Sequence, residues 1–431
     1  MSTSHAIRSV RVTPIAFRDP PLLNAAGIHE PWALRSIIEV ETASGRVGIN
    51  ESYGDLPMLE ALAKTTPALQ GLSPWALNEM ETRVAALVTP PAQARSEFLE
   101  PQVSLAPGTH VSKTVAKVVS AFEVAMMDLQ GQLAGAPVVD LLGGAARDRV
   151  PYSAYLFYKY AQHVGQPYAP DPWGEALTPE QLVAQARRMI ELHGFGSIKL
   201  KAGALPPAQE AEGVLALARA FPGTPLRIDP NANWTVATSL RIVERLRGVL
   251  EYYEDPAPGL EGMAAVARAC EVPLATNMVV TDFAEFRRNA DLGCPVKIVL
   301  SDHHYWGGLR ATQRLSTLCR TFDLGLSMHS NSHLGISLVA MTHLCASVPH
   351  LTYACDTHYP WQDDEVVEGG RLQFENGSLR VPTRPGLGVT LDREALARLH
   401  DNYLRCGIRH RDDLAQMRKY DPTFTGLQPR F

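Results

Sequence analysis

The sequence predicts an α/β protein, a (β/α)8-type barrel preceded by an α+β unit that caps it. Two observations predict this fold class. After Pro151, eight short β-rich runs alternate with amphipathic helical segments within roughly 200 residues, the pattern of a parallel barrel. Before Pro151, the chain has the mixed character of a strand, a hairpin and two helices. No GxGxxG follows the first β-rich run, so a doubly wound dinucleotide-binding sheet is the less favoured alternative.

The capping unit is expected to span residues 1–140. Within it, SVRVTPIAF alternates like a strand, and LRSIIEVETASGRVGINES is typical of a hairpin that turns at Ala43–Gly45. Apolar residues recur at helical spacing in Ser73–Val88 and in Thr114–Leu133. Asp19–Trp32 is rich in proline, glycine and alanine, which predicts a loop long enough to move.

The barrel is expected to span residues 141–385, and its predicted helices include Pro179–Gly194 and Ser239–Val249. Residues 386–431 are expected to form one helix, Asp392–Tyr403, and a polar tail that returns to the capping unit. The eight predicted strands are Ser153–Tyr158, Ser197–Leu200, Leu226–Asp229, Leu250–Glu254, Leu274–Asn277, Val296–Leu300, Gly325–Met328 and Leu351–Ala354.

The composition of the 431 residues, 45% hydrophobic and 20% charged, is ordinary for a soluble enzyme. The net charge is -5 and no basic run stands out, which argues against nucleic-acid binding. We see no secretory signal and no apolar stretch long enough to cross a membrane. Six scattered cysteines without a CxxC pair favour reduced thiols in the cytoplasm. We expect a cytoplasmic homo-oligomer whose partner is a small molecule.

Three oxygen-bearing residues end consecutive predicted strands: Asp229, Glu254 and Asn277. The carboxyl ends of barrel strands meet at one face, so these side chains can converge on one point. Acidic residues at strand ends also serve as helix N-caps, which is the alternative for each residue alone. Together, and without a cysteine among them, they favour a hard cation, Mg²⁺ or alternatively Mn²⁺.

Two candidate bases flank this metal set. Lys199 and Lys201 share one face of a strand, and mutual repulsion would lower the pKa of at least one of them. A solvated strand end is the alternative for an isolated KxK, but the nearby carboxylates favour a base. Asp302 and His329 end adjacent strands, so the carboxylate can hold the imidazole Nδ1–H and leave Nε2 free.

A divalent cation between bases predicts a reaction class. The proton alpha to a carboxylate is very weakly acidic, and a cation on the carboxylate oxygens stabilises the enediolate that forms when the proton leaves. Bases on both sides of the cation allow the proton to be removed from a carbon of either configuration. An unrelated metal-dependent hydrolase is the alternative, but such sites usually use histidine ligands, and no HxH follows the first strand.

These residues resemble the enolase superfamily, in which a Lys or His base works with Mg²⁺ on an enediolate. The resemblance covers residues from about 8 to about 413 and includes the superfamily's modified barrel with its capping domain. The glucarate dehydratases, within the mandelate-racemase-like branch, are the most similar family. The motifs that carry the resemblance are AFEVAMMDLQGQLAGAPVVDLLGG (Ala121–Gly144), KLK, DPNANW, EDP, ATNM, SDHHYW, HSNSHLGISL (His329–Leu338), DTHYPWQ (Asp356–Gln362) and PGLGV (Pro385–Val389).

The resemblance implies Mg²⁺-dependent dehydration of D-glucarate, and of its epimer L-idarate, to a keto-deoxy aldarate. It implies Lys201 as one base, with Lys199 beside it on the substrate carboxylate. It implies His329, oriented by Asp302, as the opposite base and then as the acid that helps the β-hydroxide leave. The further residues that match substrate contacts are His29, Thr109, Tyr155, Asn277, Asn331, His358 and Arg411, the last on the distal carboxylate.

This sequence departs from the family's pattern near the substrate. This chain has KLKAG where the family usually has KLKGG, and DPNANW where it has DPNGAW. The residues that follow the Trp-Gln pair of DTHYPWQ also differ from the family's. The loop after EDP is shorter than the family's, and Glu261 in that loop is a rival to Glu254 as the middle metal ligand. A dehydratase or epimerase for another acid sugar, such as galactarate or a monocarboxylic sugar acid, stays open, as does a non-catalytic binder of aldarates.

Overall fold

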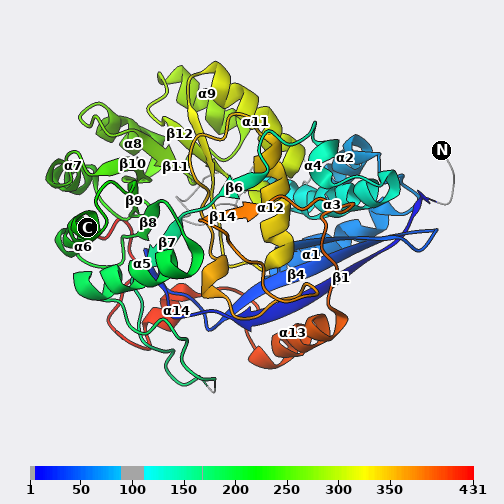
Figure 1. Cartoon of the computed structure of the whole chain (residues 1–431), viewed down its shortest axis with the longest axis horizontal. Coiled ribbons are helices and arrows are strands. Elements are labelled where there is room, and N and C mark those ends of the chain that lie inside the picture. Colours follow the sequence, from blue (N-terminus) through cyan, green and yellow to red (C-terminus); the bar gives the residue numbers. More distant parts are fainter. Residues whose placement is uncertain (1–4, 89–110, 167) are drawn as a thin grey trace, which may run out of the picture.

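A curled sheet of seven parallel strands, in the order β7-β8-β9-β10-β11-β12-β13, forms the centre of the molecule (Figure 1). The computed structural model describes residues 5–88, 111–166 and 168–431. The predicted (β/α)8-type barrel with its capping domain is confirmed, and seven predicted strands are present with ends shifted by at most two residues. These strands are β7 (Ala154–Phe157), β8 (Ile198–Lys201), β9 (Leu226–Asp229), β10 (Leu250–Glu254), β11 (Leu274–Thr276), β12 (Ile298–Ser301) and β13 (Gly325–Met328).

The eighth predicted strand, Leu351–Ala354, is not a regular strand. Two successive amides in this run donate to one carbonyl, that of Leu326, at 3.1 and 3.4 Å, which breaks the ladder of a parallel pair. Directly after it, the Cys355 amide donates to the Pro151 carbonyl and the Asp356 amide to the last carbonyl of β13, both at 2.9 Å. The segment therefore joins the two edges of the curled sheet and closes the barrel without forming a strand.

Helices cover the outside of the sheet, and their ends follow local sequence signals. For example, Thr178 and Gln181 form a capping box at the start of α5, and Gly194 ends the same helix in the left-handed region. These helices are α5 (Pro179–His193), α6 (Pro207–Ala220), α7 (Val236–Arg245), α8 (Gly259–Ala267), α9 (Phe283–Asp291), α10 (His303–Trp306), α11 (Leu309–Thr321) and α12 (Gly335–Ser347).

The capping domain is an antiparallel sheet, β1-β4-β5, with helices on one face (Figure 1). The predicted hairpin is confirmed and turns at Ala43–Gly45. The structure begins α2 four residues later than predicted and α3 three residues earlier. One hydrophobic core continues from this sheet into the barrel. The elements here are β1 (Ile7–Arg18), β4 (Trp32–Thr42), β5 (Val47–Tyr53), α1 (Leu56–Thr65), the 3-10 turn η2 (Thr66–Leu69), α2 (Leu77–Val88) and α3 (Val111–Ala134).

The segment predicted as a long loop, Asp19–Trp32, is folded into a small hairpin and is largely buried. It contains β2 (Leu23–Asn24) and β3 (Gly27–Ile28), and the Asn24 side chain accepts the amide of Gly27 at 3.0 Å. We call this segment the lid hairpin. Gly27 has φ of 150°, and a Cβ atom there would lie 2.2 Å from the Asp413 carbonyl. Only glycine therefore allows the lid hairpin to lie this close to the C-terminal segment.

The C-terminal segment contacts both the capping sheet and the lid hairpin. Helix α13 (Arg393–Cys406) packs along β1, and α14 (Asp413–Met417) packs on β3. The described residues contain no helix long and apolar enough to cross a membrane. The remaining short elements are α4 (Val138–Leu141), β6 (Arg149–Pro151), the 3-10 turn η4 (Tyr359–Trp361) and β14 (Ser378–Arg380).

Candidate active site

Two lysines lie at the end of β8, as predicted, and both are buried. Lys199 Nζ is 2.6 Å from Asp356, 2.7 Å from Glu254 and 3.4 Å from Asp229. Lys201 Nζ is 2.7 Å from Asp229. Burial alone would lower the pKa of Lys199, but Asp356 and Glu254 beside it raise that pKa well above its usual range. The expected lowering by a second lysine is therefore wrong for Lys199, because carboxylates, not the other lysine, are its nearest charges.

The carboxylates at the ends of β9 and β10 form a compact buried cluster. The ligand oxygens of Asp229, Glu254 and Asp255 lie within 4.8 Å of one another. The Asn277 amide donates to Glu254 at 3.0 Å, so the third predicted residue adjoins the cluster. Burial and the neighbouring Asp229 raise the pKa of Glu254 well above its usual range and that of Asp255 to about 7. The cluster therefore lacks positive charge.

A count of charges indicates what the cluster can hold. Among the described residues, four buried carboxyl groups, the cluster and Asp356, lie beside two lysines, and repulsion from Asp229 helps to raise the pKa of Glu254 and of Asp255. Within the part of the chain that the structure describes, one oxygen of Glu254 is buried without a hydrogen bond, although Lys199 Nζ lies 2.7 Å from it. Carboxylate and amide oxygens are the ligands that Mg²⁺ prefers. The donor set and its charge thus fit one divalent hard cation.

Glu261, the rival ligand, lies apart from this cluster. It stands in the first turn of α8 with 76% of its side chain exposed, and it pairs with Arg288 at 3.3 Å. Glu254 is fully buried within the cluster. The structure thus brings Glu254 to the other carboxylates and leaves Glu261 at the surface.

Directly after β12 and β13, the predicted Asp302 and His329 are in contact. His329 Nδ1 lies 3.2 Å from one Asp302 oxygen, and both residues are buried. The other Asp302 oxygen is 2.7 Å from Nδ1 of His304. Burial alone would raise the pKa of Asp302, but the two imidazoles hold it well below its usual range. Asp302 is therefore an ionised carboxylate that can orient His329.

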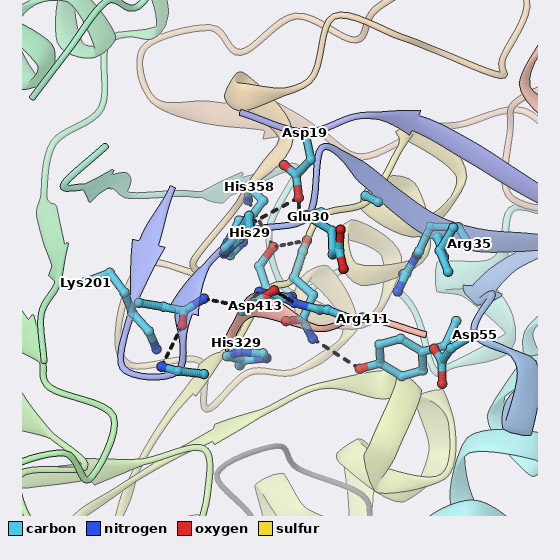
Figure 2. Close-up of a pocket in the computed structure, with 18 of the residues that line it drawn as sticks. Asp19, His29, Glu30, Arg35, Asp55, Lys201, His329, His358, Arg411 and Asp413 are labelled. Carbon is cyan, nitrogen blue, oxygen red and sulfur yellow. Dashed lines mark hydrogen bonds and ion pairs between the residues drawn. The ribbon is translucent and has the colours of Figure 1, made fainter. Parts of the chain in front are cut away.

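A cavity of about 470 Å³ opens in front of these groups, between the barrel and the capping domain. Figure 2 shows Lys201 and His329 on its barrel side, with His29, Arg411 and Asp413 on the side of the lid hairpin and the C-terminal segment. Lys199, Asp229, Glu254 and Asp302 lie behind this lining. The predicted residues that line the cavity are His29, Tyr155, Lys201, Asn277, His329, Asn331, His358 and Arg411.

The predicted substrate contacts on the barrel side are held by their neighbours. The Tyr155 ring lies 4.7 Å from Lys199 Nζ and 4.8 Å from the His358 ring, while Asn331 donates to the Tyr53 hydroxyl at 3.2 Å. These contacts place each side chain at the cavity wall. Thr109 lies outside the described residues.

At the lid side, the predicted substrate contacts Arg411 and His29 already have partners. Arg411 donates two hydrogen bonds to Asp413, at 2.8 and 2.6 Å, in the parallel geometry of a guanidinium and a carboxylate. His29 Nδ1 lies 3.0 Å from Asp19, which also accepts from Ser332 at 2.8 Å. The lid side is therefore charged but internally paired.

Several residues near the cavity escaped the sequence analysis. Asp255 and Asp356 stand in EDP and DTHYPWQ, so counting charges at the strand ends could have found them. Asp19, Arg35 and Asp413 come from the capping domain and the C-terminal segment, and no local pattern marks them. Their place at the cavity depends on how distant segments dock.

Comparisons with known proteins agree with this geometry. Residues 181–395 match the family described as Enolase C-terminal domain-like. A curated relative, a probable glucarate dehydratase from Streptomyces coelicolor, is 50% identical over 436 aligned residues and covers 100% of both chains.

Two solved structures resemble the whole chain. An enolase from Pseudomonas fluorescens Pf0-1 with bound magnesium, potassium and tartrate has 58% identity and a TM-score of 0.94, covering 99% of each chain. An enolase from Thermobispora bispora DSM 43833 complexed with magnesium and formate has 54% identity and a TM-score of 0.94, covering 99% of this chain and 100% of its own. Both of these relatives hold magnesium, and nothing here supports the alternative of Mn²⁺.

Proposed function

The chain belongs to the enolase superfamily and is a hydro-lyase, and from that premise we propose that it dehydrates an acid sugar of the D-glucarate and L-idarate type with Mg²⁺ as cofactor. The product is a keto-deoxy aldarate. The observation that carries the proposal is one cavity lined by Lys201, His329 and Asn277, directly in front of buried carboxylates in excess over cations.

Asp229, Glu254 and Asn277 are the residues that would hold the cation. When bound, the cation supplies positive charge to the substrate carboxylate, which makes the adjacent proton easier to remove. Lys199 is buried behind the cavity wall, where its ammonium adds charge to the same carboxylate.

Lys201 and His329 act on the two faces of the substrate carbon. They come from β8 and β13, which are separated by β7 and the closing segment 352–356. His329 removes the proton from D-glucarate, and Lys201 removes it from L-idarate. His329 then donates its proton to the departing β-hydroxide, and Asp302 stabilises the transient imidazolium. The other cavity-lining residues named above hold the hydroxyls and the distal end.

The test is a screen of acid sugars with Mg²⁺ that measures keto-acid formation. We expect D-glucarate and L-idarate to be converted and activity to disappear after exhaustive chelation, returning with Mg²⁺. If no six-carbon diacid yields a keto acid, or if the chelated enzyme keeps full turnover, the proposal is wrong. The cytoplasmic location and the homo-oligomeric state expected from the sequence stay predictions, and sedimentation of the purified enzyme checks the second.

One observation favours a second candidate, a monocarboxylic sugar acid. Asp413 already neutralises Arg411, so the cavity end farthest from the carboxylate cluster offers less free positive charge than a second carboxylate needs. A hydroxyl end would need only the unshared guanidinium N–H groups. Including gluconate in the screen separates the two candidates.

A further inference from the structure

Behind His329, buried polar groups run from the barrel into the capping sheet. Asp302 contacts His304, and His304 Nε2 lies 2.9 Å from a guanidinium nitrogen of Arg35 on β4. Arg35 in turn donates to Glu51 on β5 at 3.1 Å. None of these side chains is more than 7% exposed. The groups are therefore shielded from water, and each must satisfy its hydrogen bonds within the chain.

The chemistry of these groups fixes where the proton of His304 resides. A guanidinium has only donors, so His304 Nε2 must accept from Arg35. The single proton of the neutral ring is then on Nδ1, where it donates to Asp302 at 2.7 Å. A doubly protonated ring would direct an N–H at the N–H of Arg35. The hydroxyl of Ser337, 3.2 Å from the same Nε2, can donate to it as well.

This arrangement occupies one oxygen of Asp302 fully. That oxygen accepts both Nδ1–H and the backbone N–H of His304, the latter at 2.8 Å. The second oxygen is left to accept Nδ1–H of His329 at 3.2 Å, which leaves Nε2 of His329 as the nitrogen for chemistry. His304 thereby holds the carboxylate plane that sets the ring orientation of His329.

Arg35 is itself held in place from both domains. Glu51, its partner, also accepts the backbone amides of Leu334 at 2.9 Å and Ser337 at 3.0 Å, at the start of α12. The Arg35 guanidinium lies 4.8 Å from the centre of the Tyr53 ring. Figure 2 shows Arg35 on the side of the cavity away from Lys201. The group that fixes the His304 proton therefore belongs to the capping domain and not to the barrel.

We propose that His304 and Arg35 are positioning residues for His329: Arg35 fixes the His304 proton on Nδ1, and that proton aligns Asp302 with His329. Neither residue touches the reacting atoms. The proposal rests on the proposed function where it takes His329 as a base for one face of the substrate. It adds that residues of the capping sheet orient this base and have no such effect on Lys201 of β8.

The first test needs no substrate. In protein with ¹⁵N-labelled histidine, ¹⁵N–¹H correlation spectra distinguish the Nδ1–H from the Nε2–H tautomer for each of the 14 rings. The His304→Asn variant identifies the His304 signals by their loss. We expect the Nδ1–H tautomer in the parent enzyme and its loss in Arg35→Met. An Nε2–H tautomer, or a doubly protonated ring, in the parent would overturn the proposal.

The second test separates positioning from general damage. His304→Phe keeps a ring of similar size but removes both nitrogens. We expect it to lower His329-dependent deuterium exchange into D-glucarate about 10- to 100-fold, the usual effect of losing a partner behind a functional histidine. Lys201-dependent exchange into L-idarate should stay close to that of the parent, because Lys201 is held by Asp229 and not by His304. His304→Asn, which restores a donor near Nδ1, should recover part of the loss.

The matched control is His303→Phe, the neighbouring buried histidine, whose Nε2 has no hydrogen-bond partner among the described residues. Phenylalanine keeps a ring in the contact that His303 makes with the His304 ring at 3.9 Å. It should leave both exchange rates unchanged. If His304→Phe lowers both exchange rates equally, or neither, the positioning role is wrong. If the parent exchanges no acid sugar at all, the proposed function fails, and the tautomer measurement alone decides the proposal.

Discussion

The two ends of the cavity balance their charges in different ways. At the barrel end, Asp229, Glu254, Asp255 and Asp356 outnumber the lysines, and one oxygen of Glu254 is buried with no hydrogen bond to any described residue. At the lid end, Arg411 pairs with a carboxylate within its own segment, and His29 pairs with Asp19. The barrel end is built to receive a cation, whereas the lid end is already neutralised before any substrate arrives.

We expect the barrel end to serve the reaction itself and the lid end to serve substrate recognition. Side chains at the barrel end stand at the carboxyl ends of parallel strands or on the segment that closes the barrel. Backbone hydrogen bonds fix the spacing of these segments, so the charges are held together despite their repulsion. Side chains at the lid end stand on the lid hairpin and in the C-terminal segment around the start of α14, and contacts between segments far apart in the sequence, such as Ser332 with Asp19, hold them in place. Loss of a charge should therefore abolish turnover at the barrel end and reduce it at the lid end.

The largest effect is expected at the barrel end. Glu254→Gln should abolish turnover and also the rise in Tm that Mg²⁺ produces in the parent, because the buried cluster loses a ligand and a charge. The surface variant Glu261→Gln is the matched control and should keep both properties. Turnover and thermal unfolding are measured against Mg²⁺ concentration. Loss of both properties in Glu261→Gln, and not in Glu254→Gln, would make Glu261 in the first turn of α8 the middle ligand.

The next effect should be confined to one face of the substrate. His329→Asn is expected to lower dehydration of D-glucarate by about 100- to 10,000-fold, the usual contribution of a general acid–base residue. Lys201 is held by Asp229 and not by His329, so it should still exchange the proton of L-idarate in D₂O. The measurement is deuterium incorporation by NMR. A folded variant that exchanges neither substrate contradicts the two-base mechanism.

At the lid end, Arg411→Ala should lower kcat/KM on D-glucarate by about 100-fold, or roughly 3 kcal/mol. On the proposed function, the arginine binds the distal carboxylate and helps exclude water, so both affinity and turnover are expected to depend on it. Arg409→Ala is the control in the same segment, because Arg409 bonds only backbone carbonyls in the part of the chain that the structure describes. Equal turnover of gluconate and glucarate by the parent would mean that the lid end does not select a diacid.

The smallest expected effect is on the pH dependence of the free energy of unfolding. Burial, and then the nearby His29, lower the pKa of His358 well below its usual 6.5. Below pH of about 6.5 the unfolded chain binds this proton and the folded chain does not, so the free energy of unfolding falls as pH falls. His358→Gln should make this slope shallower by at most about 1.4 kcal/mol per pH unit. Urea unfolding at several pH values measures it, and identical slopes would show that His358 is protonated in the fold.

The barrel end was predictable from sequence because its geometry is periodic. Each β-rich run ends in the residues that the structure brings together, so strand ends alone located Lys201, Glu254 and His329. The pairing of Lys199 with Asp356 was not predicted, because the segment that closes the barrel is not a regular strand.

The lid-end residues were predicted from the family resemblance and not from a periodic pattern in the sequence. The sequence placed Arg411 near the substrate, but it gave no sign that Asp413, two residues later, would occupy the guanidinium. Arg35 lies on a predicted strand, yet its contact with His304 crosses between domains over 269 positions. His304 lies in the motif SDHHYW, two residues after the predicted Asp302. Contacts of this kind depend on docking, which no local spacing encodes.

The dependence of the lid hairpin on α14 also has a consequence during synthesis on the ribosome. His29 emerges early, but the carbonyl of Asp413 that packs on Gly27 emerges only after the whole barrel has been made. Domains form from the N-terminus as the chain grows. A nascent chain can therefore complete its strands and gather the carboxylates while the mouth of the cavity still stands open. On the proposed function, the last part of the enzyme to reach its native contacts is the part that recognises the distal end of the substrate.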